Sequence, residues 1–147
     1  MFRLSGIFLL KPRYLIPSYK TTKETIVLCN NLFGYQHHSN NRTNAFRHAL
    51  WNFKLCQRCL KTAGSSEKSA VWAKTITDLH EELLPNDELC NQMDLHNNRI
   101  GRDLFRKFSE INFDVISHLM QMMETAEKVE NIKQVKEAGS KLIFTEN

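Results

Sequence analysis

The sequence predicts an all-α protein, a single-domain bundle of about five helices. The 147 residues are 41% hydrophobic and 24% charged, a composition that supports one apolar core. Only five glycines and three prolines interrupt the chain. Apolar residues recur at helical spacing through several long stretches, without a β-hairpin signal, an internal repeat or a domain linker.

The first two helices are expected at residues 18–33 and 44–63. A serine or threonine caps the first helix, and Gly34 ends it. The second helix ends before Gly64 and carries apolar residues on more than one face. A helix with that pattern is usually central and buried.

Three further helices follow along the chain. The third spans residues 67–84 and is closed by Pro85, the fourth spans residues 87–108, and the fifth begins at Asn112. The segment from Glu124 onwards is charged, and we expect it to fray into a short helix or disorder. The chain is therefore divided into a basic and apolar N-terminal arm at 1–17, a helical domain at 18–126 and a charged C-terminal tail at 127–147.

The net charge of +4 is unevenly placed. Residues 1–60 carry nine Lys and Arg against one acid, whereas residues 61–147 carry eleven against fifteen Asp and Glu. A basic front half attracts phosphate groups, so an anionic lipid or membrane surface is one candidate partner of residues 1–23. An arm that packs over the domain is the favoured alternative. Nucleic acid is not an expected partner, because no recognition motif is present.

Neither a signal peptide nor a membrane-spanning segment is predicted. The apolar run 7–10 is short and ends at Lys11, and no stretch approaches the ~18 apolar residues of a membrane span. We expect a cytoplasmic protein, with peripheral association with the membrane as an option. The four cysteines include Cys56 and Cys59 inside a helical pattern, and buried free thiols are favoured over a zinc or redox role.

Three groups of polar residues interrupt otherwise apolar helices. They are Arg47, His48 and Trp51; Asp78, His80 and Glu81; and Asp94, Asn97, Asn98 and Arg102. Burying so many ionisable groups is costly unless they meet, so we expect them to converge in one cleft. Gly101, within the third group, indicates the close approach of another helix or of a bound group.

Clustered histidines and carboxylates with arginine suit the hydrolysis of a phosphate or acyl ester, lipid esters included. His48 is the expected general base, oriented by Asp78 or Asp94. The full set expected in catalysis is His48, Asp78, His80, Glu81 and Asp94. The set expected to bind substrate is Arg47, Trp51, Asn97, Asn98 and Arg102.

Two alternatives stay open at this point. One is a divalent metal such as zinc in place of a metal-free His–Asp dyad, with His48, His80 and Asp94 as the three protein ligands of a catalytic site. The H-E-x-x-H motif is absent, because Leu84 stands where the second histidine would fall. The other is a non-enzymatic module for a membrane surface or another partner, in which the polar network is only structural.

The same residues resemble an uncharacterised family of small bacterial domains marked by N-x-F-R-H-A-x-W, D-x-H-E and M-D-x-H-N-N-x-x-G-R. Here the motifs stand at Asn44–Trp51, Asp78–Glu81 and Met93–Arg102, so the resemblance covers roughly residues 36–108. Similar domains occur at the C-terminal ends of secreted bacterial toxins, which implies a cell-damaging activity in some members. The resemblance implies a functional site without specifying its reaction.

Overall fold

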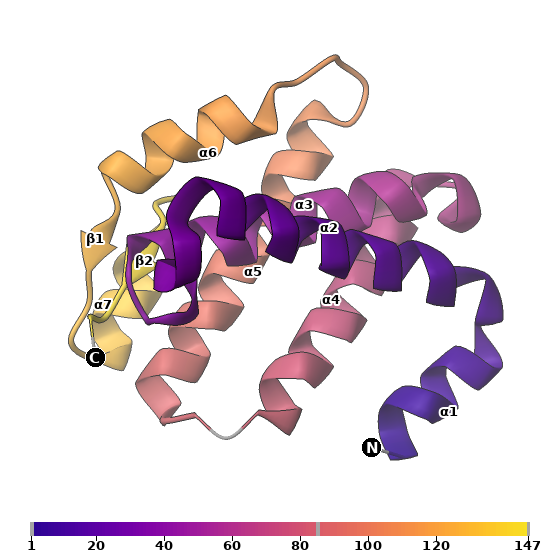
Figure 1. The fold of residues 1–147 in the computed structure, drawn as a ribbon, viewed down its shortest axis with the longest axis horizontal. Helices are drawn as coiled ribbons and strands as arrows, with labels where there is room; N and C mark the ends of the chain where they lie inside the picture. The colour runs from indigo at the N-terminus through magenta and orange to yellow at the C-terminus, as the bar shows by residue number, and fades with distance from the viewer. Residues whose placement is uncertain (1, 85, 147) are drawn as a thin grey trace.

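The computed structural model describes residues 2–84 and 86–146 and confirms an all-α, single-domain bundle (Figure 1). Its helices are α1 (Phe2–Leu10), α2 (Leu15–Phe33), α3 (Arg42–Ala63), α4 (Ser66–Leu83), α5 (Glu88–Phe108), α6 (Val115–Glu124) and α7 (Ile132–Glu137). The described chain also contains two 3-10 helices, η1 (Pro12–Tyr14) and η2 (Gly34–His38), and two short strands, β1 (Glu127–Lys128) and β2 (Ile143–Phe144).

Side-chain caps fix where the central helices begin. Asn41 accepts hydrogen bonds from two backbone N–H groups at the start of α3. Ser65 caps α4 and Asp87 caps α5, and each side chain accepts one backbone N–H. Gly64 ends α3 at a φ of 80°, the left-handed conformation that favours glycine. These ends agree with the predicted ones to within a few residues, while Pro85 lies outside the described residues.

The helix predicted from Asn112 begins later in the structure. Asp114 caps α6, because its side chain accepts hydrogen bonds from the backbone N–H and the hydroxyl of Ser117. Phe113 stacks on Phe108 with ring centroids 4.0 Å apart, which holds the preceding residues as a loop. The predicted start at Asn112 is therefore wrong.

Helix α3 lies at the centre of the bundle, as its apolar pattern predicts. It contacts α2, α4, α5 and α6, and Phe46 and Leu50 on it are fully buried. Gly101 of α5 packs so close to α3 that a Cβ there would lie 2.0 Å from the backbone oxygen of Ala49. The glycine therefore marks a contact between helices, and it holds α5 against the turn of α3 that carries His48.

The cysteines pack as ordinary core residues. All four are buried and free, which confirms the expected buried thiols. Burial raises the pKa of Cys56 to about 12 and the pKa of Cys29 and Cys59 to about 11. These thiols therefore stay protonated at neutral pH.

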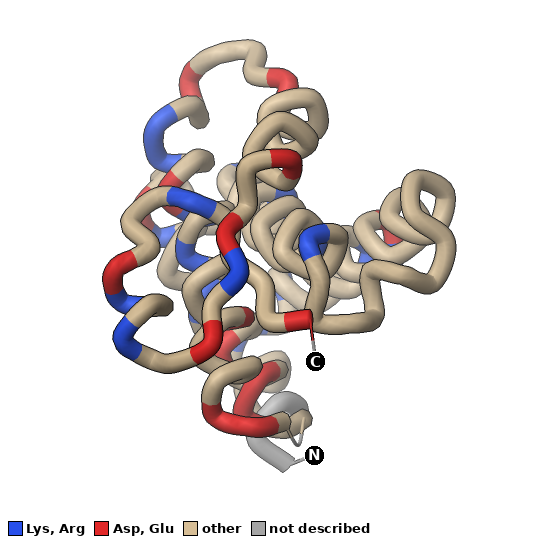
Figure 2. The backbone as a smooth tube through the Cα atoms, turned by 90° about the vertical axis from the view of Figure 1, so that its left-hand side faces the viewer, with Lys and Arg blue, Asp and Glu red and all other residues tan. Residues whose placement is uncertain are grey.

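The C-terminal segment packs onto the bundle. Strands β1 and β2 pair in parallel, and the apolar residues of the segment are buried: Val129, Val135, Leu142, Ile143 and Phe144. Charged residues of both signs lie between Val129 and Val135 and between Val135 and Leu142. Figure 2 shows both signs along the chain that leads to the C terminus. A short helix is present, α7, but the fraying expected from Glu124 onwards is wrong, because buried apolar residues anchor the segment.

The N-terminal arm also packs over the domain. Phe8 and Tyr14 contact Trp72 of α4, with ring centroids 5.8 and 4.3 Å away. No helix of the described chain is long and apolar enough to cross a membrane. The arm is attached through its aromatic rings and leaves several aliphatic side chains uncovered, among them Leu9 and Leu10.

Candidate active site

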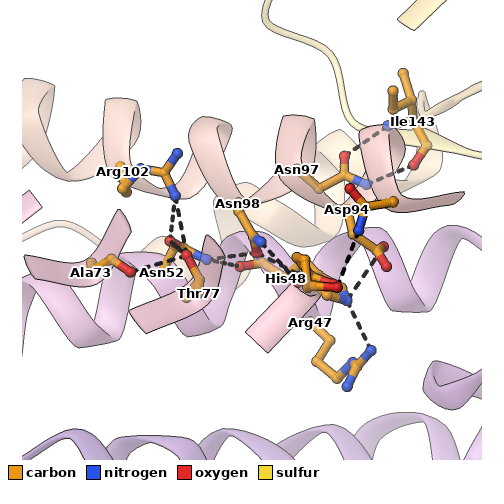
Figure 3. Close-up of polar contacts among 12 residues, drawn as sticks. Arg47, His48, Asn52, Ala73, Thr77, Asp94, Asn97, Asn98, Arg102 and Ile143 are labelled. Carbon is orange, nitrogen blue, oxygen red and sulfur yellow. Dashed lines mark hydrogen bonds and ion pairs between the residues drawn. The ribbon is translucent and has the colours of Figure 1, made fainter. Parts of the chain in front are cut away.

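Three helices bring members of all three predicted polar groups together. Helix α3 supplies Arg47 and His48, and α5 supplies Asp94 and Asn98, as Figure 3 shows. Helix α4 supplies Glu81. The exposed fractions are 2% for His48, 6% for Glu81 and 5% for Asp94. We call these five residues the central cluster.

The hydrogen bonds of His48 define its tautomer. Its Nδ1 lies 3.0 Å from Oδ1 of Asn98, which can only accept, so Nδ1 carries the proton. Nη2 of Arg47 lies 2.9 Å from Nε2 and can only donate, so Nε2 is the acceptor. Burial and the adjacent Arg47 charge hold the pKa of His48 well below its usual value. His48 is therefore a neutral imidazole with its lone pair on Nε2.

Two carboxyl groups flank this ring. Oε1 of Glu81 lies 3.5 Å from Nδ1 of His48 and accepts a hydrogen bond from Nδ2 of Asn98. Oδ1 of Asp94 lies 3.4 Å from Nε2 of His48 and has no hydrogen-bond partner among the described residues. Burial and the nearby Glu81 carboxyl raise the pKa of Asp94 to about 8. Asp94 therefore keeps its proton in most molecules at neutral pH.

Arg47 is the cation of the central cluster. With Arg47 and Glu81 charged, Asp94 protonated and His48 neutral, the cluster carries no net charge, the state that burial favours. Nε of Arg47 is buried without a hydrogen-bond partner among the described residues. An anionic group bound beside the guanidinium would supply the missing acceptor.

The cluster also meets the distance requirement of a metal site. One donor atom each from His48, Glu81 and Asp94 lies within 4.8 Å of the others. Glu81, and not the predicted His80, is therefore the third residue of this set. A metal would compete with Arg47 for Nε2 and with the proton of Asp94, because protein ligands bind metals in their deprotonated forms.

A second polar group, one turn further along α3, is hydrogen-bonded internally. Oδ1 of Asn52 accepts from Nη1 of Arg102 at 2.8 Å and from the Thr77 hydroxyl at 3.1 Å. Nδ2 of Asn52 donates to Oδ1 of Asn98, which links this group to the central cluster. Asn52 and Thr77 are not among the predicted site residues, although Asn52 follows His48 by one helical turn on the same face. Arg102 is buried here on neutral partners (Figure 3).

Asn97 faces the C-terminal segment. Its Nδ2 donates to the backbone oxygen of Ile143 at 2.9 Å, and its Oδ1 accepts from the N–H of Ile143 at 3.1 Å. This pair of hydrogen bonds holds β2 against α5, as Figure 3 shows. The contacts of Asn97 are therefore structural ones.

Asp78 lies apart from the central cluster. Its Oδ2 pairs with Lys74, one turn earlier on α4. It also borders a small cavity together with Ile7 and Leu79. Asp94, rather than Asp78, is the aspartate that faces the ring of His48.

His80 and Trp51 border a larger cavity of about 940 Å³ between the start of α2 and the end of α4. Their rings meet edge to face with centroids 5.1 Å apart. Trp51 follows Arg47 by one turn of α3, and His80 precedes Glu81 on α4. The part of the cavity wall formed by Trp51 and His80 therefore lies on the same helical turns as the central cluster.

These features define the class of protein: a small all-α domain whose central helix carries a buried histidine between two carboxyl groups. No curated protein and no solved structure matches the chain. The chain belongs to the DUF6973 family, described as a domain of unknown function, whose family model matches residues 5–127. The matched range contains the whole central cluster and the wall of the larger cavity.

Proposed function

We propose that this domain is a hydrolase that cleaves a phosphate or acyl ester at the central cluster. One observation carries the proposal: Nε2 of a neutral, buried His48 faces a protonated carboxyl group of Asp94 across 3.4 Å. Burial lowers the pKa of the base, His48, and raises the pKa of the acid, Asp94. An acid and a base tuned in this way can act together as a proton-transfer pair.

The contacts of each residue set its role in the reaction. Asn98 holds the Nδ1–H of His48, so that Nε2 can take a proton from an attacking water. Asp94 gives its proton to the departing oxygen of the ester. Arg47 turns from Nε2 to the anionic group of the substrate, which frees the base and stabilises the charge of the transition state. Before substrate binds, the negative charge of Glu81 balances the positive charge of Arg47.

The motif resemblance supports the proposal. Every member of the central cluster lies inside the segments Asn44–Trp51, Asp78–Glu81 and Met93–Arg102. Similar bacterial domains at the C-terminal ends of secreted toxins imply a cell-damaging activity. Hydrolysis of cellular esters is a chemistry that damages cells, so a toxin-like role fits the proposed reaction.

The test is the hydrolysis of a panel of chromogenic phosphate and acyl esters of different chain lengths. We expect His48→Gln and Asp94→Asn each to lower kcat by about 100-fold or more, the usual contribution of general acid–base catalysis. His37→Gln is the matched control, because His37 is fully buried but its side chain bonds to Asn30 and to no member of the central cluster. Full activity in His48→Gln, or an equal loss in His37→Gln, would overturn the proposal.

A structural role for the polar network is the second candidate function. The internally satisfied group of Asn52, Thr77 and Arg102 favours it, because such a network fixes how helices pack. The domain would then be a non-enzymatic module that binds a partner or a membrane surface. Calorimetry shows whether His48→Gln and Asp94→Asn still fold. This candidate is selected if both variants are unfolded and the folded wild type hydrolyses none of the esters.

A further inference from the structure

The larger cavity is lined almost wholly by apolar side chains. Figure 1 shows how α1 folds back from the start of α2. Residues of α1, the start of α2 and the end of α4 line the cavity. Its two sides include Phe8, Leu15 and Tyr19, and Ile76, Leu83 and Leu84. Its volume of about 940 Å³ is in the range of sites for small molecules, ~300–1,000 Å³.

Of the three hydroxyl groups in the cavity wall, those of Ser18 and Thr22 have partners inside the protein, and that of Tyr19 belongs to a side chain that is 66% exposed. Oγ of Ser18 accepts the indole N–H of Trp72 at 3.0 Å. Oγ1 of Thr22 accepts the indole N–H of Trp51 at 2.9 Å and donates to the backbone oxygen of Ser18. A peptide or polar ligand would lose hydrogen bonds to water here, whereas a hydrocarbon chain loses none. The lining therefore selects a hydrocarbon chain.

The surface around the cavity combines exposed apolar and cationic side chains. Leu9 is 81% exposed, Ile16 is 64% exposed and Leu84 is 50% exposed. Arg13 and Lys20 are also exposed, and neither forms an ion pair with another residue in the described part of the chain. Residues 1–23 contain no acid. Apolar side chains among unpaired cations complement the surface of an anionic membrane.

We propose that the cavity takes one acyl chain of an anionic membrane lipid while Arg13 and Lys20 hold the protein on the bilayer surface. The chain lies between α2 and α4, and its ester end meets the wall formed by Trp51 and His80, beside the central cluster. The substrate class is then a lipid ester. That assignment rests on the proposed function, whereas the binding of the chain does not.

The test uses the 147-residue chain and vesicles of phosphatidylcholine, either alone or mixed with phosphatidylglycerol whose acyl chains carry bromine. Bromine quenches indole fluorescence at contact range. The chain has two tryptophans, so Trp72→Phe leaves Trp51 in the cavity wall as the reporter. We expect brominated phosphatidylglycerol to remove most of the Trp51 emission and unbrominated lipid to leave it. Wild type compared with Trp51→Phe gives the same answer if Trp72→Phe loosens the arm.

Two pairs of variants separate chain entry from surface attachment. Leu84→Glu puts a charge in the cavity wall and should abolish quenching, whereas Val71→Glu, at 54% exposure on α4 outside the cavity, should not. The double variant Arg13→Glu and Lys20→Glu should lower co-sedimentation with phosphatidylglycerol vesicles by about tenfold or more. Its control, Lys61→Glu with Lys68→Glu, makes the same change in net charge on exposed positions elsewhere and should bind normally.

The outcomes are distinguishable. Co-sedimentation without quenching would show attachment without chain entry and would overturn the inference, and so would equal quenching in Leu84→Glu and Val71→Glu. Capture by neutral vesicles as strongly as by anionic ones would overturn the role of the cations. Quenching without hydrolysis of the bound lipid supports the chain site and contradicts the proposed function alone.

Discussion

Oδ1 of Asp94 lies 3.4 Å from Nε2 of His48 inside the bundle. The pKa of each group is shifted in the direction that favours its neutral form. Burial is the largest cause of both shifts. A carboxylate becomes neutral by gaining a proton, whereas an imidazolium becomes neutral by losing one. The two pKa shifts therefore act on folding stability in opposite directions as pH changes.

The folded protein should lose stability as pH rises from 6.5 to 8. Asp94 has a pKa of 3.8 when unfolded and about 8 when folded, so its contribution to stability is complete below pH 3.8 and is lost as pH rises through 8. His48, whose folded pKa lies below 6.5, contributes stability above pH 6.5 that is lost on acidification. The two effects offset each other below pH 6.5, and Asp94 acts alone above it.

Urea unfolding at a series of pH values across this interval measures the effect. The free energy of unfolding of the wild type should fall by up to about 1.4 kcal/mol per pH unit. Asp94→Asn should flatten the profile, because the amide cannot titrate. A wild-type profile that is already flat between pH 6.5 and 8 would mean that Asp94 is ionised in the folded protein.

The sequence was sufficient for the fold because the signals for helices are local. Caps such as Asn41, Ser65 and Asp87 lie next to the helices that they begin, and the apolar period places His48 on an inward face. The order of the C-terminal segment could not be predicted in this way, because its residues make long-range contacts, such as that between Ile143 and Asn97. A local period in the sequence does not reveal such contacts.

The candidate site was harder to predict because it depends on how helices rotate and cross. Asp78 and Glu81 lie on the same side of α4, yet only Glu81 turns towards His48. Asn52 and Thr77 form their bond only because α3 and α4 cross at that level. A helical period gives the face of each residue, but it does not give the partner across the interface.

Gly101→Ala should destabilise the fold by about 1–3 kcal/mol, the usual effect of overpacking a tight contact. A Cβ at residue 101 would meet the backbone of Ala49, which cannot rotate away as a side chain can. Gly6→Ala is the control, because no atom lies within 4 Å of the added carbon there. Urea unfolding of both variants checks the prediction, and equal stability would show that α3 and α5 can separate without loss.

Asn97→Ala should release β2 and cost about 2–4 kcal/mol, because the N–H and C=O of Ile143 would be left without their partner. Hydrogen exchange of the amides around Ile143 should accelerate more than exchange in α3. Asn112→Ala, an exposed loop position, should change neither quantity. Unchanged exchange in Asn97→Ala would mean that the C-terminal segment is held by its apolar residues alone.

Arg47→Gln should increase the affinity of the central cluster for zinc by about tenfold or more, because it removes a positive charge and a competing donor from Nε2 of His48. Arg58→Gln is the control, since Arg58 pairs with Glu24 on the surface. Elemental analysis and calorimetric titration with zinc measure the difference, and affinity should rise with pH as Asp94 loses its proton. Wild-type protein that instead carries one zinc per chain, lost in His48→Ala, would replace the metal-free acid–base pair with metal-activated water.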